Sequence, residues 1–210
     1  MQKQVKTIQP VPSILDKPAK QRILEASDEV FRLYGIRAGT GAIAHRAHSN
    51  VATVIKHFGY HERLVAHFIK SLIQGAEKHW REVEASHPND PETTLRYWIY
   101  SEGNDDVFRG ETLLSRSAAE LQQFPKDPLL NDIEQYWQAE RRRAAKLCHA
   151  AGFREPGELA DKLLLLVHGS RNERKAYGYR APSQMLSQAG DDLMVAHGAT
   201  RKPAFDFDDD

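Results

Sequence analysis

The sequence is poor in the features that mark secreted, membrane-spanning and disulfide-stabilised proteins. It has one cysteine in 210 residues, which excludes an intramolecular disulfide framework and suits a reducing compartment. No apolar run approaches the about 20 residues that a membrane-spanning helix needs. The N-terminus is polar, is interrupted by prolines and lacks the apolar centre of a signal peptide. We therefore expect a cytoplasmic protein that makes no membrane contact, with residues 1–17 forming a flexible arm.

The chain has no excess of charge of either sign, but its charges are unevenly distributed. Residues 1–63 contain ten Lys and Arg against five Asp and Glu, so this part carries +5 and the remainder carries −5. The asymmetry favours an N-terminal surface for a polyanion and a body that need not touch one. Ordinary surface charge is the alternative explanation. A composition that is 40% hydrophobic and 28% charged is typical of a globular protein.

Strand-like alternation is scarce, and apolar residues recur mainly at helical spacing. One stripe recurs at steps of three and four residues and consists of Ile23, Ala26, Ser27, Val30, Phe31 and Tyr34, after which Gly35 is a typical helix stop. Gly110 is expected to mark the start of a helix, whereas Gly35 marks the end of one. The pattern predicts an all-α protein of about nine helices. They are expected near residues 18–34, 41–47, 51–57, 61–85, 91–103, 111–122, 129–151, 158–177 and 182–197.

Only the first three predicted helices have a spacing typical of a specific function. Thr40 is expected to cap the second helix, and Ser49 or Asn50 the third, with a tight turn at His48-Ser49-Asn50. Small and apolar residues are available for the crossing of the two helices (Ala42, Ile43, Ala44, Ala47, Ala52, Val54 and Phe58). Such a helix-turn-helix places its second helix in the major groove of DNA. The polar candidates for contacts with DNA are Thr40, Asn50, Thr53, Lys56 and His57.

Residues 23–65 resemble the N-terminal domain of the tetracycline-repressor (TetR) family of transcription regulators. The matching positions are Ile23-Leu24, Ala26, Phe31, Gly35, Ile43-Ala44, Ala47, Thr53, His57-Phe58 and Leu64. The resemblance implies a helix-turn-helix DNA-binding domain at 18–62, a helical regulatory and dimerisation domain at 63–198 and an acidic tail at 199–210. It also implies contacts with operator DNA, and we assign these to Thr40, Asn50, Val51, Thr53, Lys56, His57 and His61.

The motif also departs from the family's pattern. His48 stands in place of the usual turn glycine, Ile55 in place of a phosphate-contacting tyrosine, and His61 in place of a lysine. Val51 replaces a polar residue, although it can still contact a thymine methyl group. The segment before Ile43 is one residue shorter than usual. Because each departure removes a phosphate or hydrogen-bonding contact, a TetR-like helical dimer with weakened or lost operator binding is the alternative. It would act as a ligand-binding or protein-interaction module.

The resemblance implies a repressor that an unidentified small-molecule effector releases from its operator. We expect the effector cavity among the middle helices, with lining residues drawn from Phe68, Tyr97, Tyr100, Leu114, Tyr136 and His168, although spacing does not separate lining from core packing. The run Leu163 to Val167 is apolar all round its helix and must be buried on more than one side, in the body or against another chain. By resemblance, the helices at 158–177 and 182–197 form a homodimer interface.

An enzyme or metal protein is the third hypothesis, and we rank it last. The sequence has no nucleophile elbow, phosphate-binding loop or dinucleotide-binding glycine pattern. The histidine pairs His45/His48 and His57/His61 have no cysteine or carboxylate nearby at ligand spacing. Cys148 is a lone cysteine in a predicted helix, where it is more often a small packing residue than a redox or metal group. We therefore expect no catalysis, no metal and no cofactor.

Overall fold

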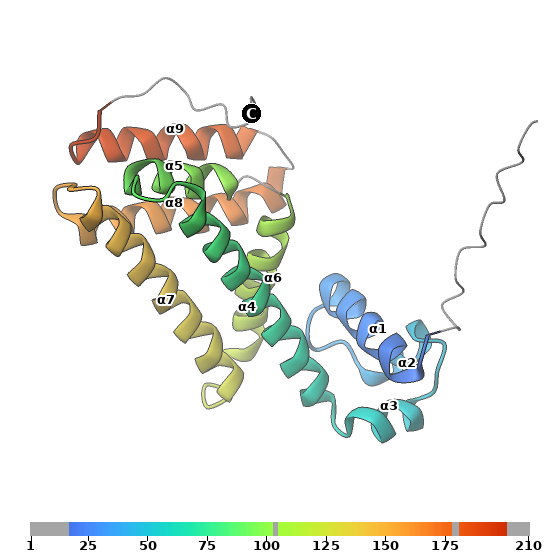
Figure 1. Cartoon of the computed structure of the whole chain (residues 1–210). Coiled ribbons are helices and arrows are strands. Elements are labelled where there is room, and N and C mark those ends of the chain that lie inside the picture. Colours follow the sequence, from blue (N-terminus) through green and yellow to red (C-terminus); the bar gives the residue numbers. More distant parts are fainter. Residues whose placement is uncertain (1–16, 103–104, 178–180, 201–210) are drawn as a thin grey trace, which may run out of the picture. The chain divides into compact units, whose positions relative to one another are not determined.

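The computed structural model describes residues 17–102, 105–177 and 181–200; the side chains of 105–109, 111, 172–177 and 181–184 are outside this description. Within these ranges the chain forms nine helices and no strand, so the prediction of an all-α protein is confirmed. The helices are α1 (Ala19–Tyr34), α2 (Thr40–Arg46), α3 (Val51–Phe58), α4 (His61–Ser86), α5 (Pro91–Ser101), α6 (Asp105–Leu121), α7 (Pro128–Ala150), α8 (Pro156–Tyr177) and α9 (Ala181–Ala196) (Figure 1). The predicted arm, apart from Lys17, and the acidic residues of the predicted tail lie outside the described residues.

The chain divides into two compact units, Met1–Phe68 and Ile69–Asp210. The N-terminal unit comprises α1, α2, α3 and the first turns of α4. Its core includes Ile23, Phe31, Ile43 and Leu64, which are all buried. The rings of Phe31 and Phe68 lie 5.4 Å apart between centroids. The first turns of α4 therefore complete the core of the N-terminal unit, and the division falls inside α4 rather than at its start.

The ends of the short helices follow from their capping residues. Gly35 (φ 90°) ends α1 and Gly59 (φ 73°) ends α3, two backbone conformations that glycine adopts easily. The side chain of Asn50 caps α3, as predicted. The prediction for Thr40 is wrong. Gly39 occupies the N-cap position of α2 in extended backbone, and Thr40 is the first residue of the helix, which therefore begins without a side-chain cap.

The C-terminal unit contains the remainder of α4 and helices α5 to α9. In it α7 packs against α8, α8 against α9, and α5 against both α7 and α9. The indole rings of Trp80 and Trp98 stack with centroids 5.0 Å apart in its core. None of the helices in the described part of the chain is long and apolar enough to cross a membrane.

The start of α6 differs from the prediction, which placed it after Gly110. The helix begins at Asp105, so Gly110 lies inside it. A glycine within a helix costs only about 1 kcal/mol relative to alanine. The burial of Leu114, Ala118 and Leu121 along the same helix offsets that loss. The other helices begin and end within about two residues of the predicted positions.

Candidate nucleic-acid interface and ligand cavity

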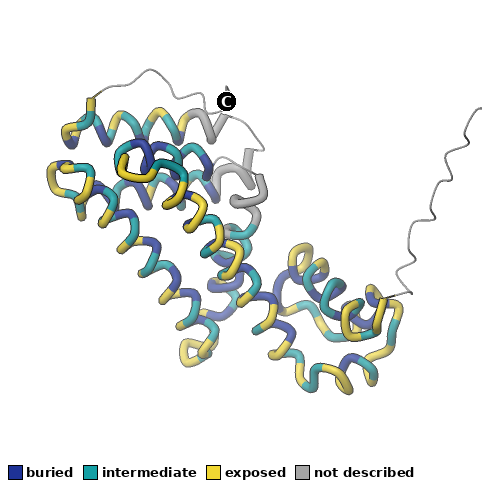
Figure 2. Tube along the Cα trace, in the orientation of Figure 1, coloured by how far each residue is buried: buried dark blue, intermediate teal, exposed yellow. Residues whose placement is uncertain are grey.

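Helices α2 and α3 are joined by the tight turn that the sequence predicted. The N–H of Ser49 donates to the Ala44 carbonyl oxygen at 2.9 Å and thereby closes the turn. His48 has a left-handed backbone (φ 48°) and an exposed side chain. Val54 points into the core of the unit, whereas much of the rest of α3 is exposed (Figure 2). The arrangement is a supporting helix followed by helix, turn and exposed second helix.

Asn50 and Thr53 form one hydrogen-bonded group at the N-terminus of α3. The Oδ1 atom of Asn50 accepts from the Thr53 N–H at 2.8 Å and lies 3.0 Å from the Thr53 hydroxyl, which donates to it. These side chains therefore stabilise the helix start, a role that is typical of an N-cap asparagine. Two further predicted DNA contacts, Lys56 and His57, are exposed in the last turn of α3.

Several cations of the N-terminal unit pair with acids of the same unit. Lys17 lies 2.7 Å from Glu25, and Arg32 lies 2.7 Å from Asp28. Arg46 pairs with Glu29. Lys20, Lys56 and Arg63 have no ion-pair partner among the residues that the structure describes. Fewer positive side chains are therefore left to meet phosphates than the charge count of the sequence indicates.

His61 is held by the interior of the N-terminal unit. Its Nε2 atom lies 2.9 Å from the carbonyl oxygen of Ile36, to which it donates a hydrogen bond. Its ring meets the ring of Phe31 edge-on, with centroids 5.5 Å apart. The ring that we predicted to contact phosphate is therefore engaged with the loop after α1. Thr40, at the start of α2, is half-buried, and Val51 is exposed.

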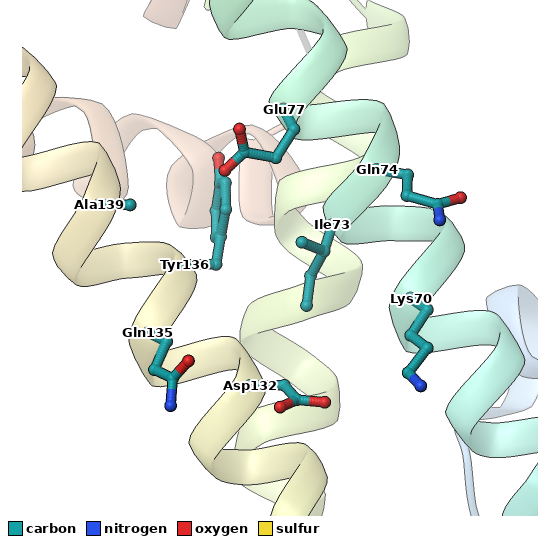
Figure 3. Close-up of a pocket in the computed structure, with 8 residues that line it drawn as sticks. All are labelled: Lys70, Ile73, Gln74, Glu77, Asp132, Gln135, Tyr136 and Ala139. Atoms are coloured by element: carbon teal, nitrogen blue, oxygen red, sulfur yellow. The ribbon is translucent and has the colours of Figure 1, made fainter.

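A cavity of about 400 Å³ lies between α4 and α7 in the C-terminal unit. The side chains from the two helices face each other in Figure 3. Four lining residues come from α4 and four from α7: Lys70, Ile73, Gln74, Glu77, Asp132, Gln135, Tyr136 and Ala139. Glu77 is paired with Arg143 at 2.5 Å. The cavity is open to solvent, and its lining combines apolar side chains with amides and charges of both signs.

The structure places one of the six predicted ligand-binding residues, Tyr136, in the lining of this cavity. Phe68 lies in the core of the N-terminal unit, where it packs against Phe31. Leu114 is fully buried. The ring of Tyr97 lies 5.6 Å from that of His87, and Tyr100 is half-buried. The sixth residue, His168, lies at the edge of a separate group of buried charges.

The buried charge cluster consists of Glu102, Glu140 and Arg171, and the half-exposed ring of His168 lies at its edge. Arg171 donates to Glu102 at 2.8 Å and to Glu140 at 3.2 Å, and all three side chains are buried. His168 Nε2 lies 3.2 Å from Glu140, and the indole N–H of Trp98 donates to Glu102 at 3.0 Å. Burial favours the neutral acid, but Arg171 and His168 outweigh it and hold the pKa of Glu140 below its usual value.

The sequence contains a signal for this cluster in the helical spacing of its buried residues. Glu140 continues the buried face of α7, because Tyr136, Glu140, Ala144 and Cys148 follow one another at steps of four. Arg171 likewise lies four residues after the buried Val167 of α8. A charged residue at a core position of a helix needs a buried partner of opposite sign. Spacing alone does not say which residue that partner is.

Cys148 lacks the features of a reactive thiol. It is fully buried, and burial raises the pKa of its thiol to about 12. The thiolate is the nucleophile and the metal ligand, so a thiol in this environment is chemically inert at neutral pH. No group of three or more metal-ligating side chains comes together among the described residues.

No protein-family model matches the chain. No curated protein matches it either.

Solved structures of transcription regulators match the fold over nearly its whole length. A TetR-family regulator from Streptomyces coelicolor aligns with a TM-score of 0.78 at 17% identity, covering 88% of this chain and 92% of that one. A TetR regulator from Haloarcula marismortui aligns with a TM-score of 0.67 at 18% identity, covering 85% of this chain and 97% of that one. A transcriptional regulator from Saccharomonospora viridis, crystallised with choline, aligns with a TM-score of 0.70 at 17% identity, covering 86% of this chain and 96% of that one. The chain therefore has the fold of the TetR-family transcription regulators.

Proposed function

We propose that this protein is a homodimeric, DNA-binding transcription regulator, a repressor that a small-molecule effector releases from its operator. The observation that carries the proposal is the exposed helix α3, capped by Asn50 and held by the tight turn after α2. The second helix of a helix-turn-helix enters the major groove with its N-terminal residues nearest the bases. Exposed Lys56 and His57 at the other end of α3 are available for phosphates. A cytoplasmic location follows from this function.

The test is a fluorescence titration of the protein with DNA from upstream of its own gene, at two salt concentrations. Binding should weaken as salt rises, because each neutralised phosphate releases counterions. Lys56→Ala should weaken binding to every sequence and reduce the slope of log K against log salt by about 1. Lys126→Ala, which removes an exposed lysine of the C-terminal unit, is the matched control. Absence of binding at low salt would overturn the proposal.

The cavity between α4 and α7 is our candidate for the effector site. The phenol ring of Tyr136 and the carboxylate of Asp132 offer an aromatic face and a negative charge, which together suit an organic cation. The Saccharomonospora viridis regulator of the same fold was crystallised with choline. Choline and other quaternary ammonium compounds are therefore the first probes. An effector would release DNA by binding more tightly to the conformation that does not fit the operator. Effector binding and DNA binding would then be linked by a coupling free energy between the two sites.

A thermal-shift screen with these compounds tests the effector site. Ile73→Trp should fill the cavity and abolish the shift. The control is Leu33→Trp, which changes an exposed position of α1 in the other unit and should leave the shift intact. If the ligand still shifts the melting temperature of the Ile73→Trp variant, the effector binds elsewhere.

Dimerisation through α8 and α9 completes the proposal. Two recognition helices about 34 Å apart meet successive major grooves on one face of DNA. Each of the last two helices leaves a large apolar side chain exposed, Leu165 on α8 and Met185 on α9, with 76% and 68% of their surface accessible. Of the rest of the apolar run in α8, Leu163, Leu164 and Val167 are buried within the chain and Leu166 is half-buried.

The apolar surface of α3 favours a second candidate, a regulator-like dimer that has lost specific operator binding. Val51 and Ile55 are exposed where a polar residue and a tyrosine are expected. This candidate predicts that ligand binding persists and that DNA is bound weakly and without sequence preference. An enzyme or metal protein ranks third, and metal analysis of the purified protein is its test.

A further inference from the structure

Three aliphatic side chains are exposed on helix α3, two of them in its first turn. Val51 and Ile55 are 42% and 54% exposed, and Ala52 between them is exposed as well. Ile55 lies four residues after Val51 and three after Ala52, the spacings at which helix side chains are neighbours, so Ile55 joins the other two in one patch. We call it the aliphatic patch. None of these side chains can donate or accept a hydrogen bond.

Asn50, the polar residue that precedes the aliphatic patch, does not replace the missing hydrogen bonds. Asparagine reads adenine by accepting with Oδ1 and donating with Nδ2 at the same time. Both acceptor positions of Asn50 Oδ1 are used by Thr53, through its N–H and its hydroxyl. Bidentate recognition of a base by Asn50 would therefore break the cap of α3.

The major groove offers one apolar feature to such a surface, the methyl group on C5 of a pyrimidine. On the basis of the proposed function, we infer that the aliphatic patch reads C5-methyl groups of pyrimidines in the operator, those of thymine or of 5-methylcytosine, and no hydrogen-bonding group of the bases. Specificity then depends on where methyl groups lie along the groove. The donors and acceptors of the bases contribute little.

Charge complementarity favours DNA over a protein partner for this surface. Among the described residues from 17 to 63 there are eight Lys and Arg against four Asp and Glu. Lys56 and His57 are exposed directly beside Ile55. An aliphatic patch next to cations matches the base edges and the flanking phosphates of a major groove.

The experiment begins with selection of the preferred duplex from a random library by the full-length protein. Each thymine of the selected half-site is then examined in four base pairs, namely T·A, U·A, 5-methylcytosine·G and C·G. These pairs separate the methyl group from the hydrogen-bonding pattern, and they also distinguish the two sources of the methyl. Affinity is measured by fluorescence anisotropy at fixed salt.

At the positions that the aliphatic patch contacts, the two methylated pairs should bind alike and the two unmethylated pairs should bind about fourfold more weakly. A fourfold change follows from about 0.8 kcal/mol for each buried methyl. Val51→Ala and Ile55→Ala should each remove the methyl effect at one position of the half-site. Both residues are exposed, so these variants should keep the wild-type Tm. Lys56→Ala, as the control, should bind more weakly yet retain the full methyl effect.

Three results would overturn the inference, and they differ from one another. Discrimination of T·A from 5-methylcytosine·G at the contacted positions would show that hydrogen-bonding groups are read. Equal affinity for T·A and U·A everywhere, with a sequence preference retained, would also exclude the methyl as the feature recognised. Binding without any sequence preference would remove specific readout while leaving DNA binding in place. Absence of binding at low salt would instead overturn the proposed function itself.

Discussion

His48 holds a left-handed backbone conformation in the turn between α2 and α3, with φ of 48° and an exposed side chain. A residue with a Cβ atom is strained there by roughly 1–2 kcal/mol, and glycine is not. His48→Gly also makes the unfolded chain more flexible, which offsets part of the gain. The variant should therefore stabilise the N-terminal unit by about 0.5–1 kcal/mol. Hydrogen exchange of the amides of α1 to α3 measures the change.

His45→Gly is the matched control for this substitution. His45 is also exposed but lies in α2 with helical backbone, where glycine costs about 1 kcal/mol. The two variants should shift exchange in opposite directions. A loss of protection in His48→Gly would show that the side chain, and not the backbone, determines the stability of the turn.

His79 gives the C-terminal unit a dependence on pH. Burial lowers the pKa of its imidazole below the ordinary value of 6.5, and its Nε2 atom lies 3.1 Å from the Ser101 hydroxyl. The unfolded chain therefore binds a proton more readily than the folded one, so stability is full above about pH 6.5 and falls as pH decreases. The free energy of unfolding, measured by urea titration between pH 7.5 and pH 5.5, should decline. His79→Gln should make that decline smaller, and an unchanged slope would exclude His79 as its source.

At the scale of single residues, the sequence was sufficient where a local rule decides the structure. Gly35, Asn50 and Gly59 end or cap helices as their chemistry predicts. It was insufficient for His61, because the hydrogen bond to Ile36 depends on how the loop after α1 folds over the start of α4. No spacing rule contains that information.

At the scale of helices, α9 lies close to α5 at Gly190. A Cβ atom added there would lie 2.8 Å from Cδ1 of Ile99, a buried side chain in α5. Gly190→Ala should therefore destabilise the C-terminal unit by about 1–2 kcal/mol, because overpacking exceeds the gain in helix propensity. Adding Ile99→Val removes the nearest carbon and should recover part of the loss. Thermal or urea denaturation gives the values.

Gly75→Ala is the control for a helical glycine without neighbours. A Cβ atom at Gly75 in α4 meets nothing within 4 Å. The substitution should stabilise the protein by up to about 1 kcal/mol. If Gly190→Ala were stabilising to the same extent, the close approach of α9 to α5 would not be a feature of the native packing.

At the scale of helices, periodicity predicted the elements but not their partners. It gave most of the nine helices of the described chain within about two residues. It failed at the start of α6, where tertiary packing continues a helix through Gly110. Periodicity also did not predict the cavity lining, because it does not distinguish Tyr136 from a core aromatic residue. The lining follows from the way α4 and α7 face each other.

For the whole molecule, the division into a DNA-binding unit and a regulatory unit was inferred from a resemblance that covers only residues 23–65. The remainder of the chain matched only in length and helical character, yet the solved structures align with 85–88% of the whole chain. Packing patterns in such helical bodies persist when the residues change, because cores tolerate substitution at constant volume and patterning. The fold was therefore predictable, while the effector was not.

The proposed dimer is the property of the whole molecule that a single substitution tests best. Leu165 is exposed on α8 although Leu163, Leu164 and Val167 of the same apolar run are buried, and covering such a side chain contributes about 1.5–3 kcal/mol in each of two symmetry-related positions. Leu165→Glu would place two carboxylates in that interface and should convert the dimer to a monomer, as measured by size-exclusion chromatography with light scattering. Binding to an operator with two half-sites should fall with it.

Phe124→Glu is the matched control, because Phe124 is also a large exposed apolar residue, with 61% of its surface accessible, but lies between α6 and α7. It should leave the molecular mass and DNA affinity unchanged. A Leu165→Glu variant that remains dimeric would exclude α8 as the centre of the interface. A variant that becomes monomeric while retaining full operator affinity would show that each recognition helix binds its half-site independently, and the dimer would then have no role in DNA recognition.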